Sequence, residues 1–469
     1  MIDNFYQFHS FETEEGLFDL YIDGVPVWER IRFKIHRKIE EQSGVGQPHT
    51  SIEQDTVDYI KGGLMLLKNS FIGNPYFCDD SDLLFVGHPR RKEEPDGYWW
   101  DIYSDPIHES CEFDYVHLEF PRLLNHNQPA RTDDLRYLDI IKYGSKLQRR
   151  LRIRTPEVPE ESQQQLVDVQ KAIRDRFGAD IDFVSLVHRE LHVRNTRLWM
   201  YRRLLNRIDP EVVVIVVSYG KETFIEACQS KGIPVVELQH GVIHSDHLGY
   251  SYSGSRTKEM FPDYFLTWGE FWEDRVELPI PDNRVIPVGY PYLEQRRNQY
   301  TDIASKDQIL FISQGTIGEP LSKFAIEVDQ HPDIDYNVMY KLHPGEYDRW
   351  REEYPWLVNA DFEVIDGSQP PLYQLFAESS VQVGVGSTAI YEGLAFDLET
   401  YVYDCPGSEI LEPVVAENSA EIVSSVEEFI GKLGTASGRF DRDRYFAPDA
   451  TEQVCAVLDD LCDSENTDI

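Results

Sequence analysis

The chain has 469 residues, of which 41% are apolar, and this predicts a folded protein of two or three domains. Its 83 acidic residues against 45 basic ones give a formal net charge of −38. The acids are spread along the whole chain, which favours a salt-loving host, such as a halophilic archaeon, over a protein built to bind basic partners. The charge argues against nucleic-acid binding, which needs a basic surface, and no nucleic-acid partner is expected.

The six cysteines lie far apart and none forms a CxxC pair, so neither a zinc site nor a disulfide framework is expected. Reduced thiols in a cytoplasmic protein are the simplest interpretation. The N-terminus is polar and acidic and has no signal-peptide pattern, and no apolar run reaches the ~18 residues that cross a bilayer. Contact with the inner face of a membrane, if the chain makes any, is expected to be peripheral.

Residues 1–75 are predicted to form a helical N-terminal extension. In residues 27–39, apolar side chains recur at helical spacing beside a cluster of arginines and lysines. This segment either docks on an anionic membrane or a partner, or faces the core and keeps a solvated basic side. The second interpretation is the simpler. Further helices are expected near 133–150, 160–177, 182–207, 418–432 and 450–462.

Two series of short apolar runs alternate with helix-length segments, which is typical of doubly wound α/β sheets. We therefore predict two Rossmann-like domains, an N-terminal one at 76–295 and a C-terminal one at 296–469. Residues 290–307 are polar and irregular and suit a linker. The predicted strands are 81–89, 113–118, 211–217, 233–239, 264–269 and 284–289 in the first domain, and 308–313, 336–342, 362–366, 380–386 and 399–404 in the second.

Ligands of open α/β sheets bind beyond the carboxyl ends of the strands, so the residues after each strand are candidates for a site. The segment GVGSTAIYEG at 384–393 turns from a strand into a helix. Its N–H groups and the hydroxyls of Ser387 and Thr388 suit a phosphate, and Glu392 suits a ribose hydroxyl; the alternative is an ordinary N-cap.

In KLHPG, Lys341 and His343 share one face of the strand, and His343 can donate to a phosphate or a leaving group.

Polar strand ends also occur in the N-terminal half. His240, in QHG, is either a satisfied residue at the core edge or a catalytic base. His88 precedes the basic triplet at 90–92, which is unusual in so acidic a chain. That triplet either receives an anionic acceptor or forms a solvated loop.

In chain order, the motifs QHG, TWG, VGYP, K-x-HP and GSTAIYEG resemble those of GT-B enzymes of surface-polysaccharide synthesis, over about 210–405. The most similar families are the CDP-glycerol glycerophosphotransferases of teichoic-acid assembly and the capsule-type transferases that use CMP-sugars. The resemblance implies that His343, Ser387 and Thr388 hold the nucleotide phosphate. It also implies a catalytic role for His240.

The sequence therefore predicts a GT-B transferase whose two domains face a cleft. A nucleotide-activated sugar or alditol phosphate would bind the C-terminal domain, and a glycan or lipid-linked acceptor the N-terminal one. His240 is the first candidate for the base, and Asp96 the second. No metal or cofactor is expected. The alternatives are a GT-B nucleotide-sugar 2-epimerase, which needs no acceptor, and a non-catalytic glycan-assembly subunit. The expected site residues are His240 and His343 (catalytic), Ser313, Gln314, Gly315, Thr316, Lys341, Pro344, Gly386, Ser387, Thr388 and Glu392 (donor), and His88, Arg90, Arg91, Asp96 and His244 (acceptor).

Overall fold

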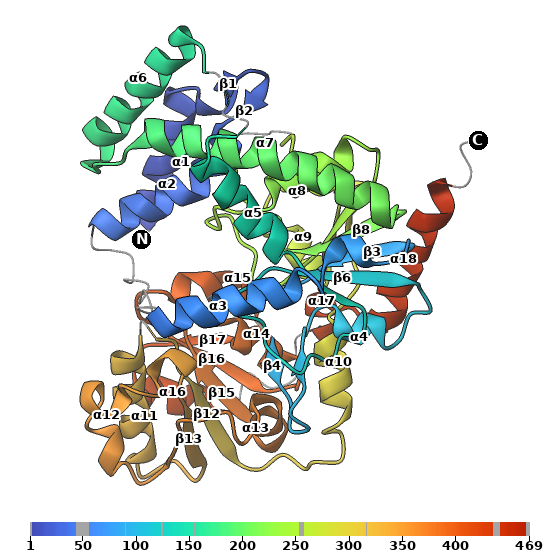
Figure 1. The fold of residues 1–469 in the computed structure, drawn as a ribbon. Helices are drawn as coiled ribbons and strands as arrows, with labels where there is room; N and C mark the ends of the chain where they lie inside the picture. The colour runs from blue at the N-terminus through green and yellow to red at the C-terminus, as the bar shows by residue number, and fades with distance from the viewer. Residues whose placement is uncertain are drawn as a thin grey trace. The chain divides into compact units, whose positions relative to one another are not determined.

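The computed structural model describes residues 2–43, 56–89, 91–122, 125–153, 156, 158–252, 258–315, 317–434 and 441–465. It divides into two compact units. Unit 1 consists of Met1–Thr267, Trp272–Pro287 and Thr451–Ile469, and unit 2 of Trp268–Phe271 and Val288–Ala450. Each unit layers helices on a β-sheet (Figure 1).

The described residues of unit 1 form a parallel sheet of seven strands in the order β11-β10-β9-β8-β3-β6-β7. Numbered along the chain, the strands run 7-6-5-4-1-2-3, which is the Rossmann order with one strand added. The order reverses between β3 and β8, and this switch point is where such sheets bind ligands. The strands are β3 (Leu83–Val86), β6 (Tyr115–Glu119), β7 (Leu135–Tyr137), β8 (Val212–Val216), β9 (Val235–Leu238), β10 (Tyr264–Thr267) and β11 (Val285–Pro287).

Unit 2 has a parallel sheet of six strands in the order β14-β13-β12-β15-β16-β17, over its described residues. Along the chain this is 3-2-1-4-5-6, the Rossmann order itself. Its switch point lies between β12 and β15. The strands are β12 (Gln308–Ile312), β13 (Asn337–Lys341), β14 (Glu363–Ile365), β15 (Val381–Gly384), β16 (Glu399–Tyr403) and β17 (Glu421–Val423).

The two predicted sheets are confirmed, and each has one edge strand more than the sequence predicts, β7 and β17. Their central strands are continuous apolar runs, which is why the sequence identifies them. All five residues of β8 are buried, and so are all five of β12, as expected of strands covered on both faces. Helices supply that cover. Apart from the N-terminal helices described below, unit 1 has α4 (Asp105–His108), α5 (Asp139–Arg150), α7 (Phe183–Ile208) and α8 (Glu222–Gln229), and unit 2 has α10 (Pro291–Asn298), α11 (Gly318–Asp329), α12 (Trp350–Glu353), α13 (Leu372–Glu378), α14 (Thr388–Leu394), α15 (Glu412–Ala416), α16 (Val426–Lys432) and α17 (Arg442–Tyr445).

The long helix α7 joins the N-terminal helices to the sheet of unit 1. Its first half packs Phe183 and Leu191 into an apolar cluster with the N-terminal helices, and its second half packs Leu204 and Ile208 against the sheet. The predicted helical extension is thereby confirmed, and the apolar side of its basic helix faces this core. The cluster also includes residues of α1 (Ile2–Glu14), α2 (Trp28–Ser43), α6 (Glu160–Phe177) and the hairpin of β1 (Tyr21–Ile22) with β2 (Val25–Pro26). Outside this cluster, unit 1 has α3 (Thr56–Asn69) and the hairpin of β4 (Lys92–Glu93) with β5 (Trp99–Trp100).

Three segments differ from the prediction. The segment at 133–150 begins with β7 before α5, and the one at 418–432 begins with β17 before α16. Each of these edge strands has three residues, too few for a period to show, and each forms because a neighbouring strand pairs with it. The expected linker contains α10, which starts with a proline at its first turn and buries Tyr292 and Leu293.

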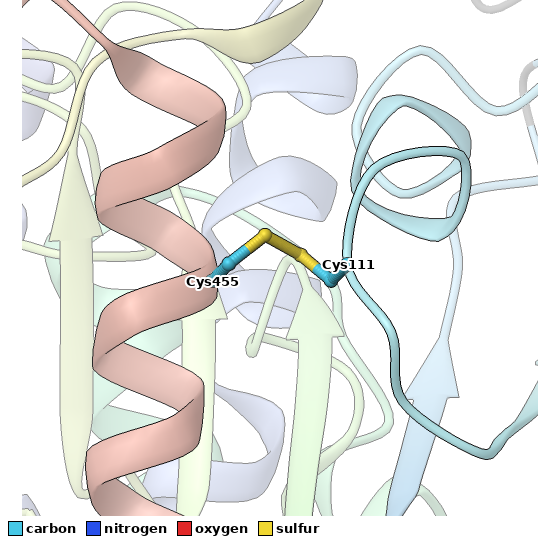
Figure 2. Close-up of a disulfide and its surroundings, with 2 residues drawn as sticks. All are labelled: Cys111 and Cys455. Atoms are coloured by element: carbon cyan, nitrogen blue, oxygen red, sulfur yellow. A yellow bond between two sulfur atoms is a disulfide. The ribbon is translucent and has the colours of Figure 1, made fainter.

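The expectation of six reduced thiols is wrong for one pair. Cys111 and Cys455 form a disulfide, with their Cα atoms 5.7 Å apart, between the loop after α4 and the helix α18 (Ala450–Glu465) (Figure 2). The two residues are 344 positions apart, so no spacing in the sequence could indicate the pair. They meet because the last helix belongs to unit 1. Across the residues described, no helix combines the length and apolarity needed to span a bilayer.

Candidate functional site

Three loops meet at the carboxyl edge of the unit 2 sheet, around its switch point. A methyl group built on Gly315, in the loop after β12, would lie 3.6 Å from Nδ1 of His343, in the loop after β13. One built on Gly386, in the loop after β15, would lie 3.3 Å from Oε1 of Gln314. The structure thus gathers the predicted donor residues of these loops at the place where α/β sheets bind ligands.

The His343 ring is oriented by its own loop. The Gly345 N–H donates to Nδ1 at 3.1 Å, and the His343 N–H donates to Oε2 of Glu346 at 2.8 Å, which caps the 3-10 helix Pro344–Glu346. Because Nδ1 accepts a hydrogen bond, the neutral ring carries its proton on Nε2. His343 is exposed, so this arrangement suits donation from Nε2 to an anionic oxygen.

Glu346, which the sequence analysis missed, ties the first two loops together. Its side chain is fully buried, and its Oε1 accepts hydrogen bonds from Ser313 Oγ at 3.1 Å and from the Tyr354 hydroxyl at 2.9 Å. Ser313 is buried as well, and its Oγ accepts from the Tyr340 hydroxyl at 3.2 Å. Ser313 therefore positions the loop. The available signal was the His-x-x-Glu spacing of a capping box.

Gly318→Ala should destabilise unit 2 by about 1–3 kcal/mol, because the added methyl overpacks this junction. It would lie 2.3 Å from Oε1 of Glu346 and 2.3 Å from the Tyr354 hydroxyl oxygen. Gly367→Ala is the matched control, since its methyl would meet nothing within 4 Å. Urea denaturation of both variants measures the difference, and equal free energies of unfolding would contradict the described packing.

The third loop caps its helix with its own serine. Ser387 Oγ accepts from the Ala389 N–H at 3.3 Å, so the N-cap alternative applies to this hydroxyl. Glu392 interacts with Tyr373, whose pKa is raised far above its usual value, first by burial and then by this carboxylate. The other predicted donor residues in these loops are Thr388, which is half-buried, Pro344, which is exposed, and Thr316, which lies outside the described residues.

Lys341 ends β13 and is almost fully buried. Its Nζ donates to the Tyr347 hydroxyl and to the Gly367 carbonyl, both at 2.6 Å. Burial lowers the pKa of this ammonium group to about 8, with the nearby Asp366 opposing the shift. The charge at this strand end therefore titrates near neutral pH.

In unit 1, His240 follows β9 and is held by three tyrosines. The Tyr250 hydroxyl lies 3.1 Å from Nδ1, and the Tyr219 hydroxyl lies 3.4 Å from Nε2. The Tyr103 hydroxyl donates to the His240 carbonyl at 2.8 Å. Ring and backbone are therefore both fixed at the carboxyl edge of the sheet.

A buried carboxylate lies behind this histidine. The Tyr250 hydroxyl donates to Oε1 of Glu237 at 2.6 Å, and the Ser218 N–H donates to the same oxygen at 3.0 Å. Since Tyr250 gives its proton to Glu237, its oxygen can accept from the Nδ1–H of His240, and Nε2 then carries the lone pair. Burial raises the pKa of Glu237, and burial and this carboxylate raise that of Tyr250. The sequence analysis missed both; a glutamate inside an apolar strand was the available signal.

The backbone is strained beside this pair. Val217, directly after β8, has a φ of 68°, a left-handed conformation that β-branched residues rarely adopt. Lys221 Nζ donates to the carbonyls of Val216 and Val217 at 2.6 Å each, which stabilises this turn. Burial lowers the pKa of Lys221 to about 8. Such strain at a sheet's switch point is typical of functional sites.

The chain resembles enzymes of known structure at low sequence identity. No protein-family model and no curated protein matches the sequence. Among solved structures, the chain is similar to the UDP-GlcNAc 2-epimerase of Methanocaldococcus jannaschii (11% identity, 80% of this chain and 99% of that one, TM-score 0.48). The Neisseria meningitidis UDP-GlcNAc 2-epimerase bound to UDP-GlcNAc (12%, 81% and 99%, 0.42) and the wall teichoic acid polymerase TagF (9%, 88% and 99%, 0.44) are also similar.

Two of the predicted acceptor residues lie near His240. The rings of His88 and Tyr103 are 6.1 Å apart, and Tyr103 bonds the His240 backbone. His244 lies 6.0 Å from the His247 ring, which is 5.0 Å from that of Tyr250. Burial lowers the pKa of His244, and burial with the neighbouring His244 lowers that of His247 to about 4, so both rings are expected to be neutral at pH 7.

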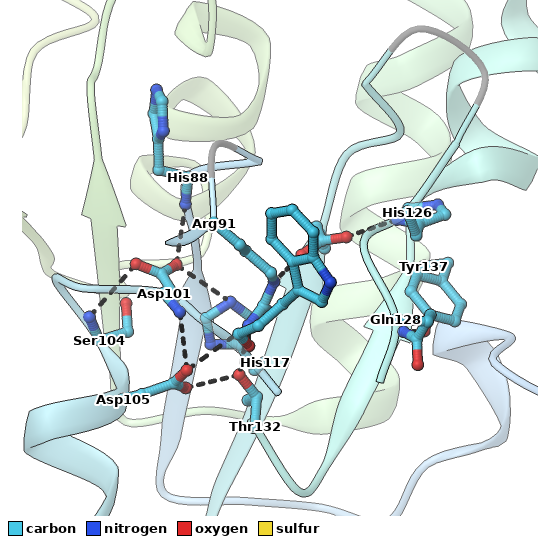
Figure 3. A network of polar contacts seen from close by, with 12 residues as sticks. His88, Arg91, Asp101, Ser104, Asp105, His117, His126, Gln128, Thr132 and Tyr137 are labelled. Atoms are coloured by element: carbon cyan, nitrogen blue, oxygen red, sulfur yellow. Dashed lines mark hydrogen bonds and ion pairs between the residues drawn. The ribbon is translucent and has the colours of Figure 1, made fainter. Parts of the chain in front are cut away.

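The other predicted acceptor residues that the structure describes, Arg91 and Asp96, both form ion pairs. Arg91 is buried, and it pairs with Glu119 and donates to Thr132 at 2.9 Å, so it supports the fold of the loop after β3 (Figure 3). Asp96 is about half exposed and pairs with Arg131 at 2.8 Å. Arg90 lies outside the described residues.

Arg91 belongs to a buried network that contains two neighbouring carboxylates (Figure 3). The Asp101 N–H donates to Asp105 at 2.7 Å, and Asp101 accepts from the His88 N–H at 3.0 Å. Burial, then Asp101, raises the pKa of Asp105 to about 7, and burial raises that of Asp101. Within the described ranges, no three His, Cys, Asp or Glu side chains are placed to hold a metal ion.

Proposed function

We propose that the protein is a transferase that moves a sugar or alditol phosphate from a nucleotide-activated donor to a hydroxyl of an acceptor. The observation that carries this proposal is the Glu237–Tyr250–His240 chain, which leaves the His240 Nε2 lone pair at the carboxyl edge of a Rossmann-like sheet. A histidine oriented by a second group is the arrangement of a general base.

In this proposal the donor nucleotide binds unit 2. Nε2–H of His343 donates to a phosphate oxygen, and the N–H groups at the start of α11 face the same edge. The Lys341 ammonium adds positive charge, which stabilises the developing charge of the leaving phosphate. The loop that contains Ser387 lies beside the loop after β12 at the same edge.

The acceptor hydroxyl binds at unit 1 and hydrogen-bonds to Nε2 of His240. As the hydroxyl attacks the donor, Nε2 takes its proton, and Tyr250 with Glu237 stabilises the resulting imidazolium through Nδ1. Proton transfer of this kind contributes about 10²–10⁴-fold to the rate. In this proposal the acceptor oxygen takes the place of the Tyr219 hydroxyl, which lies 3.4 Å from Nε2 and moves aside when the acceptor binds.

Nucleotide affinity should fall as pH rises from 7 to 9 if Lys341 attracts the donor phosphate. Its pKa of about 8 means that the ammonium form prevails below this pH and is lost above it. In Lys341→Met the affinity should be lower at pH 7 and the fall between pH 7 and 9 should disappear. Titration calorimetry at three pH values measures this, and an unchanged pH dependence in the variant would remove Lys341 from the donor site.

Turnover with and without an acceptor tests the proposal as a whole. Thermal shift against CMP-, CDP-, UDP- and GDP-activated sugars and alditols identifies the donor, because a ligand that binds the folded state raises its stability. Product from that donor is expected only when an acceptor is added. An epimerised nucleotide sugar formed from the donor alone would overturn the proposal in favour of an epimerase.

A further inference from the structure

The outer helices of unit 1 carry a row of cavities lined by basic side chains, although the chain is strongly acidic. Three cavities of about 310, 340 and 370 Å³ lie along α2, α5 and α7, and Arg189 lines all of them. We call this feature the basic groove. Its main cationic residues are Lys34, Lys38, Lys146, Arg149, Arg189 and Arg197.

The positive charge of the basic groove is only partly neutralised. In the part of the chain that is described, Lys146, Arg149 and Arg189 have no acidic partner within 4.0 Å. Of the two glutamates of the lining, Glu190 neutralises Lys34 of the groove at 2.6 Å, and Glu222 accepts from the Gly220 N–H at 2.9 Å.

A neighbouring lysine reports the same excess of positive charge. The pKa of Lys142 is lowered first by burial and then by the charges of Lys146 and Arg197. Like charges gathered in this way raise the local concentration of anions, even on a protein of net charge −38. The planar guanidinium groups of Arg149 and Arg189 suit bidentate contacts with phosphate.

The basic groove ends beside the proposed base. Its third cavity is lined by Tyr219 and Gly220, and the Tyr219 hydroxyl lies 3.4 Å from Nε2 of His240. At the other end, Leu147, Leu151 and Ile153 are 58%, 61% and 46% exposed next to the arginines of α5. A matching ligand is an elongated anion with a hydroxyl at the end near Tyr219 and an apolar group at the end near Leu147 and Leu151.

We infer that the basic groove binds the phosphate groups of the acceptor and directs its terminal hydroxyl to His240. This inference rests on the proposed transfer function and names its acceptor class as phosphate-bearing. The phosphates belong either to a soluble acceptor or to a lipid headgroup, and both present the same chemistry to Arg149 and Arg189.

Binding of inorganic tripolyphosphate, measured by calorimetry at low ionic strength, tests the basic groove directly. The double variant Arg149→Gln, Arg189→Gln should bind it about a hundredfold more weakly, because two charged hydrogen-bond donors are lost. The double variant Lys171→Gln, Arg203→Gln is the matched control, since both residues are exposed cations of unit 1 outside the groove, and its affinity should be unchanged. Equal affinity in both double variants would overturn the inference.

Vesicles distinguish the two sources of phosphate. Sedimentation with phosphatidylglycerol vesicles but not with phosphatidylcholine vesicles, abolished by tripolyphosphate and by the groove variant, assigns a lipid-linked acceptor. Tripolyphosphate binding without sedimentation assigns a soluble one. Tighter binding of single-stranded RNA than of tripolyphosphate would overturn the inference. The double variant Arg149→Gln, Arg189→Gln should keep the nucleotide-induced thermal shift of the wild type. If the wild type itself shows no such shift, the proposed function is refuted, whereas the tripolyphosphate result for the basic groove still holds.

Discussion

His240→Gln should lower kcat for transfer by about 10²–10⁴-fold and leave the affinity for the nucleotide donor unchanged. Glutamine keeps a polar side chain at the carboxyl end of β9 but cannot take a proton from the acceptor. The Tyr103 bond to the His240 carbonyl involves the backbone, so the loop should keep its position in the variant. Steady-state kinetics with saturating donor and acceptor measure the loss.

Tyr250→Phe tests whether the hydrogen bonds that orient His240 contribute to the rate. It removes the hydroxyl that joins Nδ1 of His240 to Glu237, so kcat should fall by about tenfold, less than with His240→Gln. Tyr252→Phe is the control: its hydroxyl donates to the Gly249 carbonyl and is not joined to His240. Wild-type kcat in His240→Gln would show that the base lies elsewhere.

His343→Ala should weaken nucleotide binding by about 10–100-fold, the worth of one hydrogen bond to a charged group. The structure motivates this because Nδ1 is occupied by the Gly345 N–H, which leaves the proton on Nε2. Calorimetry with the donor identified by thermal shift measures the loss.

His343→Asn serves as the comparison for that variant. An asparagine can accept from the Gly345 N–H and so can preserve the cap of the 3-10 helix Pro344–Glu346, but it cannot reproduce the Nε2 donor. Both variants should lose the same affinity, and His343→Asn should keep the stability of the wild type. Full affinity in His343→Asn would mean that the histidine acts only as a cap.

The sheets could be predicted from the sequence because their central strands are marked locally. Continuous apolar runs identify β8 and β12, and strand–helix alternation identifies their parallel order. The edge strands β7 and β17 carry no such mark and form through pairing with β6 and β16. The Cys111–Cys455 pair depends on the return of the last helix to unit 1, which is a property of the whole chain.

The residues of the candidate site that lie in the loops after the strands could be predicted, and the residues that position them could not. His240 and His343 stand in the loops where the sequence analysis places them, because the rule for ligand sites in α/β sheets depends only on strand order. Glu237 and Glu346 have only weak local signals, a glutamate inside an apolar strand and a His-x-x-Glu spacing, and their bonds to Tyr250 and Ser313 depend on the fold. Arg91 follows a strand and is basic, yet buried acids enclose it.

Hydrogen exchange with and without the donor tests the central claim, that the carboxyl edge of the unit 2 sheet binds an activated nucleotide. The expected result is slower exchange of backbone amides in residues 313–318, 341–346 and 384–389 when the donor is present, with little change at the opposite edge of that sheet. A donor that binds without slowing exchange in any of these three segments would contradict the account.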